Sequence, residues 1–554
     1  MSNINGLLLN SCPICESRRL QCIFVSRGYP VSLCRDCGFT FLNRQPSDRV
    51  LAEIYNSDYF LGEPTPQGEK AISDMKRASA ELNLQMLIEY CGKSTGRLLE
   101  IGCGKGDFLA VARKAGFDVT GIEISRHAAD RANRLLGGAC VRCGTPETAL
   151  LPGEQYDVCV AFDTIEHVRD PLQLLKIVHQ ILKPGGVLFL STPSLDSWPA
   201  RLMRRNWMEF KTEHLHYFDR QTIQNALAKS GFAEVLITPG YKYLTMDYIF
   251  NHFDKYKVPF FTPLTSLLRR LTPASIRSRQ FKIAAGGINV LCRAAHLREK
   301  PVISIVVPVY NERDTFPVLM DSLLEKELPG LDKEIIVVES NSDDGTREKA
   351  LSYQNKPGVK LVLEHRPRGK GHAVRNGFKH MTGDFVMIQD GDLEYDLNDY
   401  GQLIDPLQNY RRALVLGSRH SKGWKMRRFT DQPALALLMN CGQMLFAGLL
   451  NLSLGQRLKD PFTMFKVFRR DCLYGLTFEA DRFDFDFELI IKLLRKGYRP
   501  LEVPVNYRSR SFREGKKVSL VRDPLLWLRA LLKYRFEPLY GEYRRTEGGK
   551  KKDE

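Results

Sequence analysis

Residues 97–109, Arg-Leu-Leu-Glu-Ile-Gly-Cys-Gly-Lys-Gly-Asp-Phe-Leu, read as a buried strand, a glycine-rich turn and the start of a helix. Glycine allows the backbone to approach a ligand closely, and this turn has three glycines, Gly102, Gly104 and Gly106. A second strand follows at 118–123, and its last residue is an acid that can accept hydrogen bonds from ribose hydroxyls. The stretch therefore predicts a parallel α/β sheet with a nucleoside site where its strands end.

The acid before the first glycine, Glu100, distinguishes this motif from a dinucleotide fingerprint and makes it resemble the cofactor loop of class I methyltransferases. Residues 156–168 look like the fourth strand of that family with its following loop, 183–190 look like the fifth strand, and 213–218 resemble a later active-site segment. The resemblance covers about residues 12–298 and points to methyltransferases that modify sugars and small molecules. It implies a Rossmann-like sheet that binds S-adenosylmethionine through Glu100, Gly102, Gly104, Gly106, Glu123 and Asp163.

Methyl transfer from a sulfonium to a poor nucleophile, such as a sugar hydroxyl, needs a base. Histidine can titrate near neutral pH, and the matched segments contain His167, His214 and His216. A purely structural role is the alternative for each of them. We favour His167 and His214 as the catalytic candidates.

Four cysteines near the start of the chain form two pairs, with 18 residues between the pairs. Two knuckles of this kind offer four thiolates to Zn²⁺ in tetrahedral geometry, and a closed four-sulfur site is structural because it leaves no open position. Four unmodified thiols are the alternative. The predicted ligands of this zinc ribbon are Cys12, Cys15, Cys34 and Cys37.

An insertion interrupts the expected end of this first α/β block. A tight hairpin would be the economical connection between a sixth strand near 234–237 and a seventh near 287–292, but an aromatic and basic stretch lies between them. The alternatives are a cap over the acceptor, a surface that meets membrane or a partner, and an additional pair of packing helices.

A second α/β block begins with the strand 303–308. Its next strand, 334–339, ends in acids and turn residues, and a basic glycine-rich loop that contains Lys370 opens a helix suited to phosphate. Two aspartates one residue apart follow the strand 384–389, and such a pair can bind a hard divalent cation that neutralises a diphosphate leaving group. The predicted ligands are Asp390 and Asp392.

This ordered set resembles family 2 glycosyltransferases of the GT-A fold, especially the branch that transfers sugars to dolichyl and polyprenyl phosphates, over nearly all of residues 301–520. The resemblance implies a Mg²⁺ or Mn²⁺ ion on Asp390 and Asp392, with Glu394 as a further ligand. Two departures affect the donor site, because the second strand ends in Glu339-Ser340 instead of paired aspartates and Glu394 replaces a common amide. The implied nucleotide-sugar site comprises Pro308, Tyr310, Glu312 and Glu339 around the nucleoside, and Arg419, Arg510 and Lys516 at the phosphates, beside Lys370.

Two acceptors remain open for the metal-dependent, inverting transfer that this resemblance implies. A polyprenyl phosphate has an anionic oxygen and needs no base, whereas a glycan hydroxyl needs a carboxylate to take its proton. Asp486 is the favoured carboxylate, with Asp484 and Glu488 beside it, and their alternation predicts a strand or an extended segment before a helix. A solvated acidic face with a capping role is the alternative.

The chain has 554 residues and a formal net charge of +17, which favours anionic partners such as phosphates and anionic lipid surfaces. A basic stretch at 508–517 precedes a leucine-rich stretch at 518–536, which suits either peripheral membrane contact or a packing helix. The uncharged stretch 433–454 is long enough to span a bilayer, but its polar residues favour a helix of a soluble domain. The start of the chain lacks a signal-peptide pattern, so we expect a cytoplasmic protein, with peripheral contact at the inner face of the cytoplasmic membrane.

These patterns predict an α/β protein of four parts: a zinc-binding ribbon at 1–60, a class I methyltransferase at 61–298, a family 2 glycosyltransferase at 299–540 and a polar tail at 541–554. The favoured function is a bifunctional enzyme of cell-surface polysaccharide or glycolipid biosynthesis, which methylates a sugar or glycolipid and transfers sugar from a nucleotide donor. One alternative is a glycosyltransferase with a non-catalytic scaffold that binds S-adenosylmethionine. The other is a basic, zinc-bearing nucleic-acid methyltransferase, although we expect no nucleic acid because no recognition motif is present.

Overall fold

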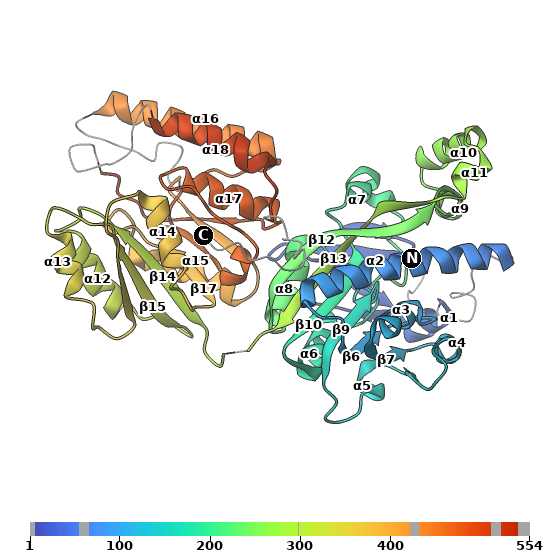
Figure 1. Ribbon diagram of the computed structural model, residues 1–554. Coiled ribbons are helices and arrows are strands. Elements are labelled where there is room, and N and C mark those ends of the chain that lie inside the picture. The colour runs from blue at the N-terminus through green and yellow to red at the C-terminus, as the bar shows by residue number, and fades with distance from the viewer. Residues whose placement is uncertain (1–5, 55–65, 297, 421–431, 511–521, 541–554) are drawn as a thin grey trace, which may run out of the picture. The chain divides into compact units, whose positions relative to one another are not determined.

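The computed structural model describes residues 6–54, 66–296, 298–420, 432–510 and 522–540. The chain forms two compact units, Met1–Leu297 and Arg298–Glu554. Figure 1 shows strands and packed helices in both units. Both are therefore α/β folds. The predicted polar tail at 541–554 lies outside the described residues.

The first unit is built on a seven-stranded sheet with the order β12-β13-β10-β9-β6-β7-β8. Strands from β10 to β8 run parallel, whereas β13 is antiparallel to both β10 and β12. The strands are β6 (Gly96–Ile101), β7 (Phe117–Glu123), β8 (Val141–Cys143), β9 (Tyr156–Phe162), β10 (Leu182–Pro193), β12 (Phe232–Thr245) and β13 (Gln280–Ala294). The helices that follow or flank them are α2 (Pro66–Cys91), α3 (Asp107–Ala115), α4 (Arg126–Leu136), α5 (Pro146–Ala149), α6 (Pro171–Ile181), α7 (Trp198–Met203) and α8 (Arg220–Lys229).

The glycine-rich turn connects β6 to α3 at the carboxyl end of the parallel strands. Gly102, Gly104 and Gly106 have φ angles of 73°, 53° and 83°, in the left-handed region that favours glycine. A side chain at Gly102 would meet the Thr164 hydroxyl at 2.6 Å, and one at Gly106 would meet Ala132 at 3.0 Å. The turn therefore needs glycine both for its backbone conformation and for close packing.

The cysteine-bearing segment packs against the methyltransferase-like sheet. Its strands β2 (Leu20–Ser26), β3 (Tyr29–Cys34) and β4 (Thr40–Leu42) form a sheet whose fourth strand is β11 (His216–Tyr217), far along the chain. Four of its cysteines belong to the same apolar cluster as Phe218 and Ile223. Although the sequence predicts a domain boundary at residue 60, both sides of this boundary belong to one compact unit. The segment also contains β1 (Gly6–Leu8), β5 (Arg44–Pro46) and α1 (Asp48–Ile54).

The insertion before the last strand is a long hairpin with helices at its tip, so the strands expected near 234–237 and 287–292 are present but extend further into the insertion. β12 and β13 pair from Phe232–Ala294 to Thr245–Gln280, and the strands continue well beyond the parallel sheet. Figure 1 shows α9 to α11 at the end of this hairpin. These helices are α9 (Met246–Tyr256), α10 (Phe261–Leu271) and α11 (Ala274–Arg277).

The second unit has a seven-stranded mixed sheet with the order β16-β15-β14-β17-β19-β18-β20. The first four strands run parallel, and β19 is antiparallel to both of its neighbours. The strands are β14 (Val302–Val309), β15 (Asp332–Glu339), β16 (Val359–Leu363), β17 (Phe385–Ile388), β18 (Leu414–Ser418), β19 (Lys466–Arg469) and β20 (Leu501–Pro504). The helices are α12 (Phe316–Glu325), α13 (Thr346–Leu351), α14 (Lys370–Phe378), α15 (Tyr400–Gln408), α16 (Pro433–Leu454), α17 (Phe485–Arg495) and α18 (Arg522–Phe536).

Helix α16 is long and apolar enough to cross a membrane, and only 28% of its most apolar window is buried. Figure 1 shows α16 and α18 side by side on the second unit, where Phe446 and Trp527 are in contact with ring centroids 5.3 Å apart. The polar residues Asn440 and Gln443 lie on the buried face of α16, whereas its exposed face carries leucines. The helix therefore packs with one face on the α/β fold, as expected for the soluble-domain alternative, and leaves an apolar face exposed.

Asp486 and Glu488 lie inside helix α17, so the prediction that they belong to a strand or an extended segment was wrong. Asp484 is the residue that precedes its first turn. The residues from Phe485 to Leu494 are all buried, so the helix shows no alternation of polar and apolar faces from which its period could be read. Glu488 accepts hydrogen bonds from the backbone amides of Glu479 and Ala480, which is a structural role.

Candidate active sites

The four predicted zinc ligands come together in the first unit. The sulfur atoms of Cys12 and Cys37 are 3.5 Å apart, as are those of Cys15 and Cys34, and all four lie within 4.8 Å of one another. Four sulfurs around a tetrahedral Zn²⁺ lie roughly 3.8 Å apart, since each Zn–S bond is about 2.3 Å. All four side chains are buried and no disulfide joins them. The set therefore fits a closed, structural zinc site.

The glycine-rich turn is surrounded by acids. Glu123 accepts hydrogen bonds from the backbone amides of Gly104, at 2.8 Å, and Ser125, at 2.9 Å. Glu100 is 4% exposed, and burial, together with Asp107 and Glu123, raises its pKa well above the usual value. One oxygen of Glu100 has no hydrogen-bond partner among the described residues. A cationic nucleoside such as S-adenosylmethionine fits this acidic, glycine-lined turn better than an anion does.

Asp163, the last predicted cofactor residue, lies just after β9 and is paired with a lysine. Lys242 Nζ is 2.5 Å from its carboxylate, and the Ser191 hydroxyl donates to it at 3.1 Å. Although burial raises the pKa of Asp163, the Lys242 ammonium holds it below the usual value. Lys242 comes from β12 and could not be singled out from the sequence, because nothing distinguishes it within the basic insertion.

The two favoured histidines are neighbours, and the third is not. The rings of His167 and His214 are perpendicular with centroids 4.6 Å apart. Burial lowers the pKa of His167 to about 4 and that of His214 well below its usual value, so both imidazoles are neutral at pH 7. His216 instead stacks on Phe39 of the cysteine-bearing segment, at 5.7 Å, which supports its structural alternative.

A cavity of about 730 Å³ lies at the carboxyl ends of β14 and β17 in the second unit. One part of its wall is charged and the other is apolar, formed by residues of α16, α17 and α18. Lys516 lies outside the described residues. The predicted site residues that line this cavity are Pro308, Tyr310, Glu312, Lys370, Asp390, Asp392, Glu394, Arg419, Asp486 and Arg510.

Carboxylates crowd together at the charged end of the cavity, and two basic side chains compensate them. Arg510 contacts Glu312 at 2.9 Å, Asp392 at 2.5 Å and Glu394 at 3.5 Å. Lys370 forms an ion pair with Asp390. Burial, with the neighbouring charges of Asp390 and Glu394, raises the pKa of Asp392 to about 7. Carboxylates that share one basic partner in this way are the oxygen ligands that a hard divalent cation prefers.

Residues 72–236 match the family model described as a methyltransferase domain, and residues 304–476 match the model for glycosyl transferase family 2. The chain joins a methyltransferase domain to a family 2 glycosyltransferase domain. The family assignment and the fold class predicted from the sequence, a Rossmann-like sheet followed by a GT-A domain, are therefore confirmed. A methyltransferase domain implies S-adenosylmethionine as its cofactor.

The second half of the chain is similar to proteins named as dolichol-phosphate and dolichyl-phosphate sugar transferases. Dolichol-phosphate mannosyltransferase of Pyrococcus furiosus is 31% identical over 214 residues, which are 39% of this chain and 58% of that protein. This chain therefore spans a little over half the length of that relative. Dolichyl-phosphate beta-glucosyltransferase of Saccharomyces cerevisiae is 26% identical over 269 residues, which are 44% of this chain and 78% of that protein.

Solved structures resemble both halves. Glucosyl-3-phosphoglycerate synthase from Mycobacterium tuberculosis, in complex with Mn²⁺, uridine diphosphate and phosphoglyceric acid, is 22% identical with a TM-score of 0.33, covering 43% of this chain and 80% of its own. A methyltransferase from Thermotoga maritima, described as a possible histamine N-methyltransferase, is 21% identical with a TM-score of 0.28, covering 40% of this chain and 91% of its own.

Glu339 of the glycosyltransferase domain does not line the cavity, contrary to its predicted role at the nucleoside. Its side chain is fully buried, accepts a hydrogen bond from the Ser342 amide at 2.7 Å and pairs with Arg347 at 2.5 Å. Ser340 lines the cavity in its place. Arg347 compensates the charge of Glu339 inside the protein, so Glu339 stabilises the loop after β15.

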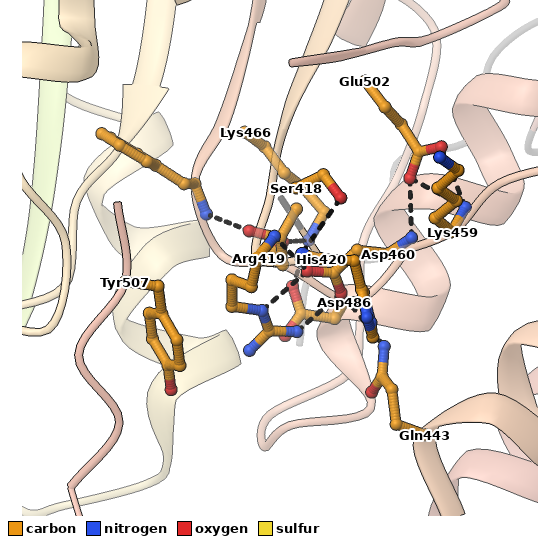
Figure 2. A network of polar contacts seen from close by, with 12 residues as sticks. Ser418, Arg419, His420, Gln443, Lys459, Asp460, Lys466, Asp486, Glu502 and Tyr507 are labelled. Atoms are coloured by element: carbon orange, nitrogen blue, oxygen red, sulfur yellow. Dashed lines mark hydrogen bonds and ion pairs between the residues drawn. The ribbon is translucent and has the colours of Figure 1, made fainter. Parts of the chain in front are cut away.

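Arg419 of the glycosyltransferase domain is anchored by a fully buried acid, Asp460. Its guanidinium contacts both oxygens of Asp460 at 2.7 Å, and Gln443 of α16 donates to the same carboxylate at 3.0 Å. Figure 2 shows this network, with Tyr507 on the other side of Arg419. Although burial raises the pKa of Asp460, Arg419 holds it below the usual value. Asp460 therefore fixes the position of Arg419 at the cavity wall.

Asp486, the predicted base, is paired with a second buried cation, Lys466, at 2.6 Å. Burial lowers the pKa of Lys466 and raises that of Asp486, and the ion pair opposes both shifts. Lys466 was also missed as a site residue, since a fully buried lysine gives no sequence signal of its own. Asp486 therefore lines the cavity while its charge is compensated by Lys466.

Proposed function

We propose that this chain is a bifunctional enzyme that transfers a methyl group from S-adenosylmethionine to a sugar or glycolipid and a sugar from a nucleotide donor to a polyprenyl phosphate. The observation that carries the second activity is one cavity with carboxylates and two basic side chains at one end and apolar residues of α16, α17 and α18 at the other. The setting would be cell-surface polysaccharide or glycolipid biosynthesis, in the cytoplasm and at the inner face of the cytoplasmic membrane.

The charged end of the cavity suits the diphosphate of a nucleotide sugar. Asp390 and Asp392, with Glu394, would hold Mg²⁺ or Mn²⁺, which neutralises charge on the leaving diphosphate when it is bound. Lys370 and Arg510 now balance those same carboxylates. If a metal cation balanced the carboxylates, Lys370 and Arg510 could instead bind the phosphates. Every charged group would then still have a partner of opposite charge. Pro308, Tyr310 and Glu312 would then line the nucleoside end.

The apolar end of the cavity favours a lipid-linked acceptor over a soluble glycan. Its wall includes Leu438 and Phe446 of α16 and Trp527 of α18, and the outer face of α16 exposes further leucines. A polyprenyl chain can occupy such a wall while its phosphate reaches the charged end. Because a phosphate oxygen is already anionic, Asp486 does not have to remove a proton and can remain paired with Lys466.

The methyltransferase half carries the residues that a cationic nucleoside needs. Glu100, the three turn glycines and Glu123 would hold S-adenosylmethionine, whose methyl group is electrophilic because it is attached to a sulfonium. Asp163 lies at the end of the neighbouring strand β9. His167 comes shortly after β9, its ring lies beside that of His214, and both would face the acceptor. The intact turn and its buried acids support catalysis over a scaffold role.

The glycosyltransferase activity can be tested with a panel of nucleotide sugars, Mg²⁺ or Mn²⁺, and a polyprenyl phosphate in vesicles. Wild type should convert at least one donor, and Asp392→Asn should abolish conversion. Asp405→Asn, an equivalent change on the exposed side of α15, should leave it intact. If wild type transfers no sugar from any donor, the proposed glycosyl transfer is refuted.

The methyltransferase activity has its own test. Calorimetry should detect S-adenosylmethionine binding by wild type and by Glu147→Gln, an exposed control, but not by Glu123→Gln. Methyl transfer to sugar or glycolipid acceptors is then followed with a labelled methyl group. Binding without transfer to any acceptor would favour the scaffold alternative.

A further inference from the structure

A cluster of three possible metal ligands lies beside the cofactor turn of the methyltransferase domain, separate from the four cysteines. Glu166 and His167 follow β9, and His214 comes from the segment before β11. One ligand atom from each lies within 4.8 Å of the other two. The loop that carries Glu166 packs on the cofactor turn, because the Thr164 hydroxyl donates to the Ile101 carbonyl at 3.2 Å.

The backbone holds the cluster together. The Glu166 carbonyl accepts hydrogen bonds from the amides of Leu215, at 2.8 Å, and His216, at 3.2 Å. The His167 Nδ1 lies 3.0 Å from the Glu213 carbonyl, so Nδ1 carries the proton and the lone pair lies on Nε2. Metal-binding histidines are commonly oriented by such a contact through their other ring nitrogen.

Two of the three side chains are buried, and the His214 Nδ1 lies 3.7 Å from the carboxylate of Glu209. Glu166 is 1% exposed and His214 is 4% exposed. Neither carboxylate oxygen of Glu166 nor the Nδ1 of His214 has a hydrogen-bond partner among the described residues. Burial of an unpaired carboxylate is costly, and a cation between the three side chains would remove that cost. His167 is only half-buried, so the cluster is accessible from one side.

We propose that Glu166, His167 and His214 form a divalent metal site of the zinc class that binds the acceptor hydroxyl in the methyltransferase domain. Two imidazoles and one carboxylate, with a fourth position left open, make up the ligand set of catalytic zinc sites. Ligand atoms around a tetrahedral zinc lie roughly 3.4 Å apart, so the widest pair in the cluster has to approach by at most about 1.4 Å. Rotations of the side chains can supply this movement.

The reaction rests on the methyl transfer proposed above and follows from ordinary metal chemistry. A hydroxyl bound at the open position loses its proton to water more readily, because the cation stabilises the alkoxide. The alkoxide oxygen forms a bond to the methyl carbon as the carbon–sulfur bond breaks. The electron pair of that bond stays on sulfur, which becomes a neutral thioether. The site therefore selects an oxygen acceptor and makes a strongly basic side chain unnecessary.

The test counts zinc in the full-length chain. Each protein carries Asp392→Asn, so that the glycosyltransferase carboxylates do not add an ion, and is loaded with zinc chloride, desalted and measured by plasma mass spectrometry. The background protein and its Glu147→Gln control should hold one zinc per chain more than Glu166→Gln or His214→Gln. Equal zinc contents in all four proteins would overturn the proposal, whatever the cysteines bind.

A second measurement separates loss of metal from loss of fold. The Kd for S-adenosylmethionine should stay within about twofold in Glu166→Gln, because this carboxylate does not belong to the cofactor turn. Methyl transfer should then require zinc in the background protein and fall at least tenfold in Glu166→Gln, in keeping with the loss of a metal-site contact. Unchanged transfer would refute the role of the metal. Failure of the background protein to bind S-adenosylmethionine would instead refute the proposed methyl transfer, and the zinc count would still decide whether the metal site exists.

Discussion

Replacing Asp460 with asparagine should destabilise the glycosyltransferase unit by more than most single substitutions. Asp460 is 0% exposed, and the side chain of its partner, Arg419, is 9% exposed. The substitution removes the negative charge and leaves Arg419 buried without it. Removing one partner of a buried ion pair costs about 3–5 kcal/mol. We expect the lower value, about 3 kcal/mol, because the amide oxygen can still accept one hydrogen bond from Arg419.

For a domain of this size, a loss of about 3 kcal/mol corresponds to a decrease in Tm of about 6–12 °C. Scanning calorimetry of the full chain should show this decrease in one unfolding transition and leave the other in place. Asp405→Asn removes an exposed charge beside Arg411 and should change the free energy of unfolding by less than about 0.5 kcal/mol.

A double variant tests the electrostatic reason directly. Asp460→Leu with Arg419→Met removes both charges and keeps most of the volume, so it should recover much of the stability that Asp460→Asn loses. Glycosyl transfer should remain impaired, because Arg419 lines the cavity. If Asp460→Asn lowers the free energy of unfolding by less than about 1 kcal/mol, the two residues are not a buried pair in which each charge depends on the other.

Three further predictions address other parts of the chain. Lys496 is 2% exposed, and burial lowers its pKa from 10.5 to about 8. The unfolded chain therefore keeps this proton to a higher pH than the folded chain does. As a result, the free energy of unfolding should rise between pH 8 and 10.5, by up to about 3 kcal/mol. Denaturant titrations should show a smaller rise in Lys496→Gln and an unchanged rise in Lys459→Gln, where the lysine is exposed. A zinc chelator, or Cys37→Ser, should lower the Tm of the transition that Asp460→Asn does not change, whereas substitution of the exposed Cys22 by serine should not. Leu445→Glu, on the exposed face of α16, should reduce cosedimentation with anionic vesicles, and an equal reduction by Leu351→Glu on α13 would argue against a specific membrane-facing surface.

The parallel core of both units could be predicted because its signals are local. Apolar runs such as 303–307 are buried strands. The turn at Gly102 needs glycine because of the positive φ angle and the close packing at that one residue. The acids at 390 and 392 could also be found, since they directly follow a buried strand. Each of these features depends on short stretches of chain whose period and turn residues are visible in the sequence.

The parts that were missed depend on contacts between distant residues. The long β12 and β13 strands stabilise each other by pairing, so neither shows its full length alone. Helix α17 is buried on all sides and therefore lacks an amphipathic period. The counter-ions Lys242 and Lys466 come from elements far from the acids that they balance. Their roles follow from tertiary proximity, which single-sequence patterns do not contain.

The charges of the two sites predict ligands of opposite sign. At the cofactor turn, Glu123 is buried, and burial with the neighbouring acids raises the pKa of Glu100, so a sulfonium nucleoside bound there would favour the ionised form of Glu100 and balance its charge. In the glycosyltransferase cavity, the carboxylates already have Lys370 and Arg510 as counter-ions. We expect an anionic diphosphate to bind there together with a cation that takes over the carboxylates, because both sets of charges must remain balanced in a buried site. The same requirement for charge balance therefore predicts a cationic cofactor at the first site and a divalent metal at the second.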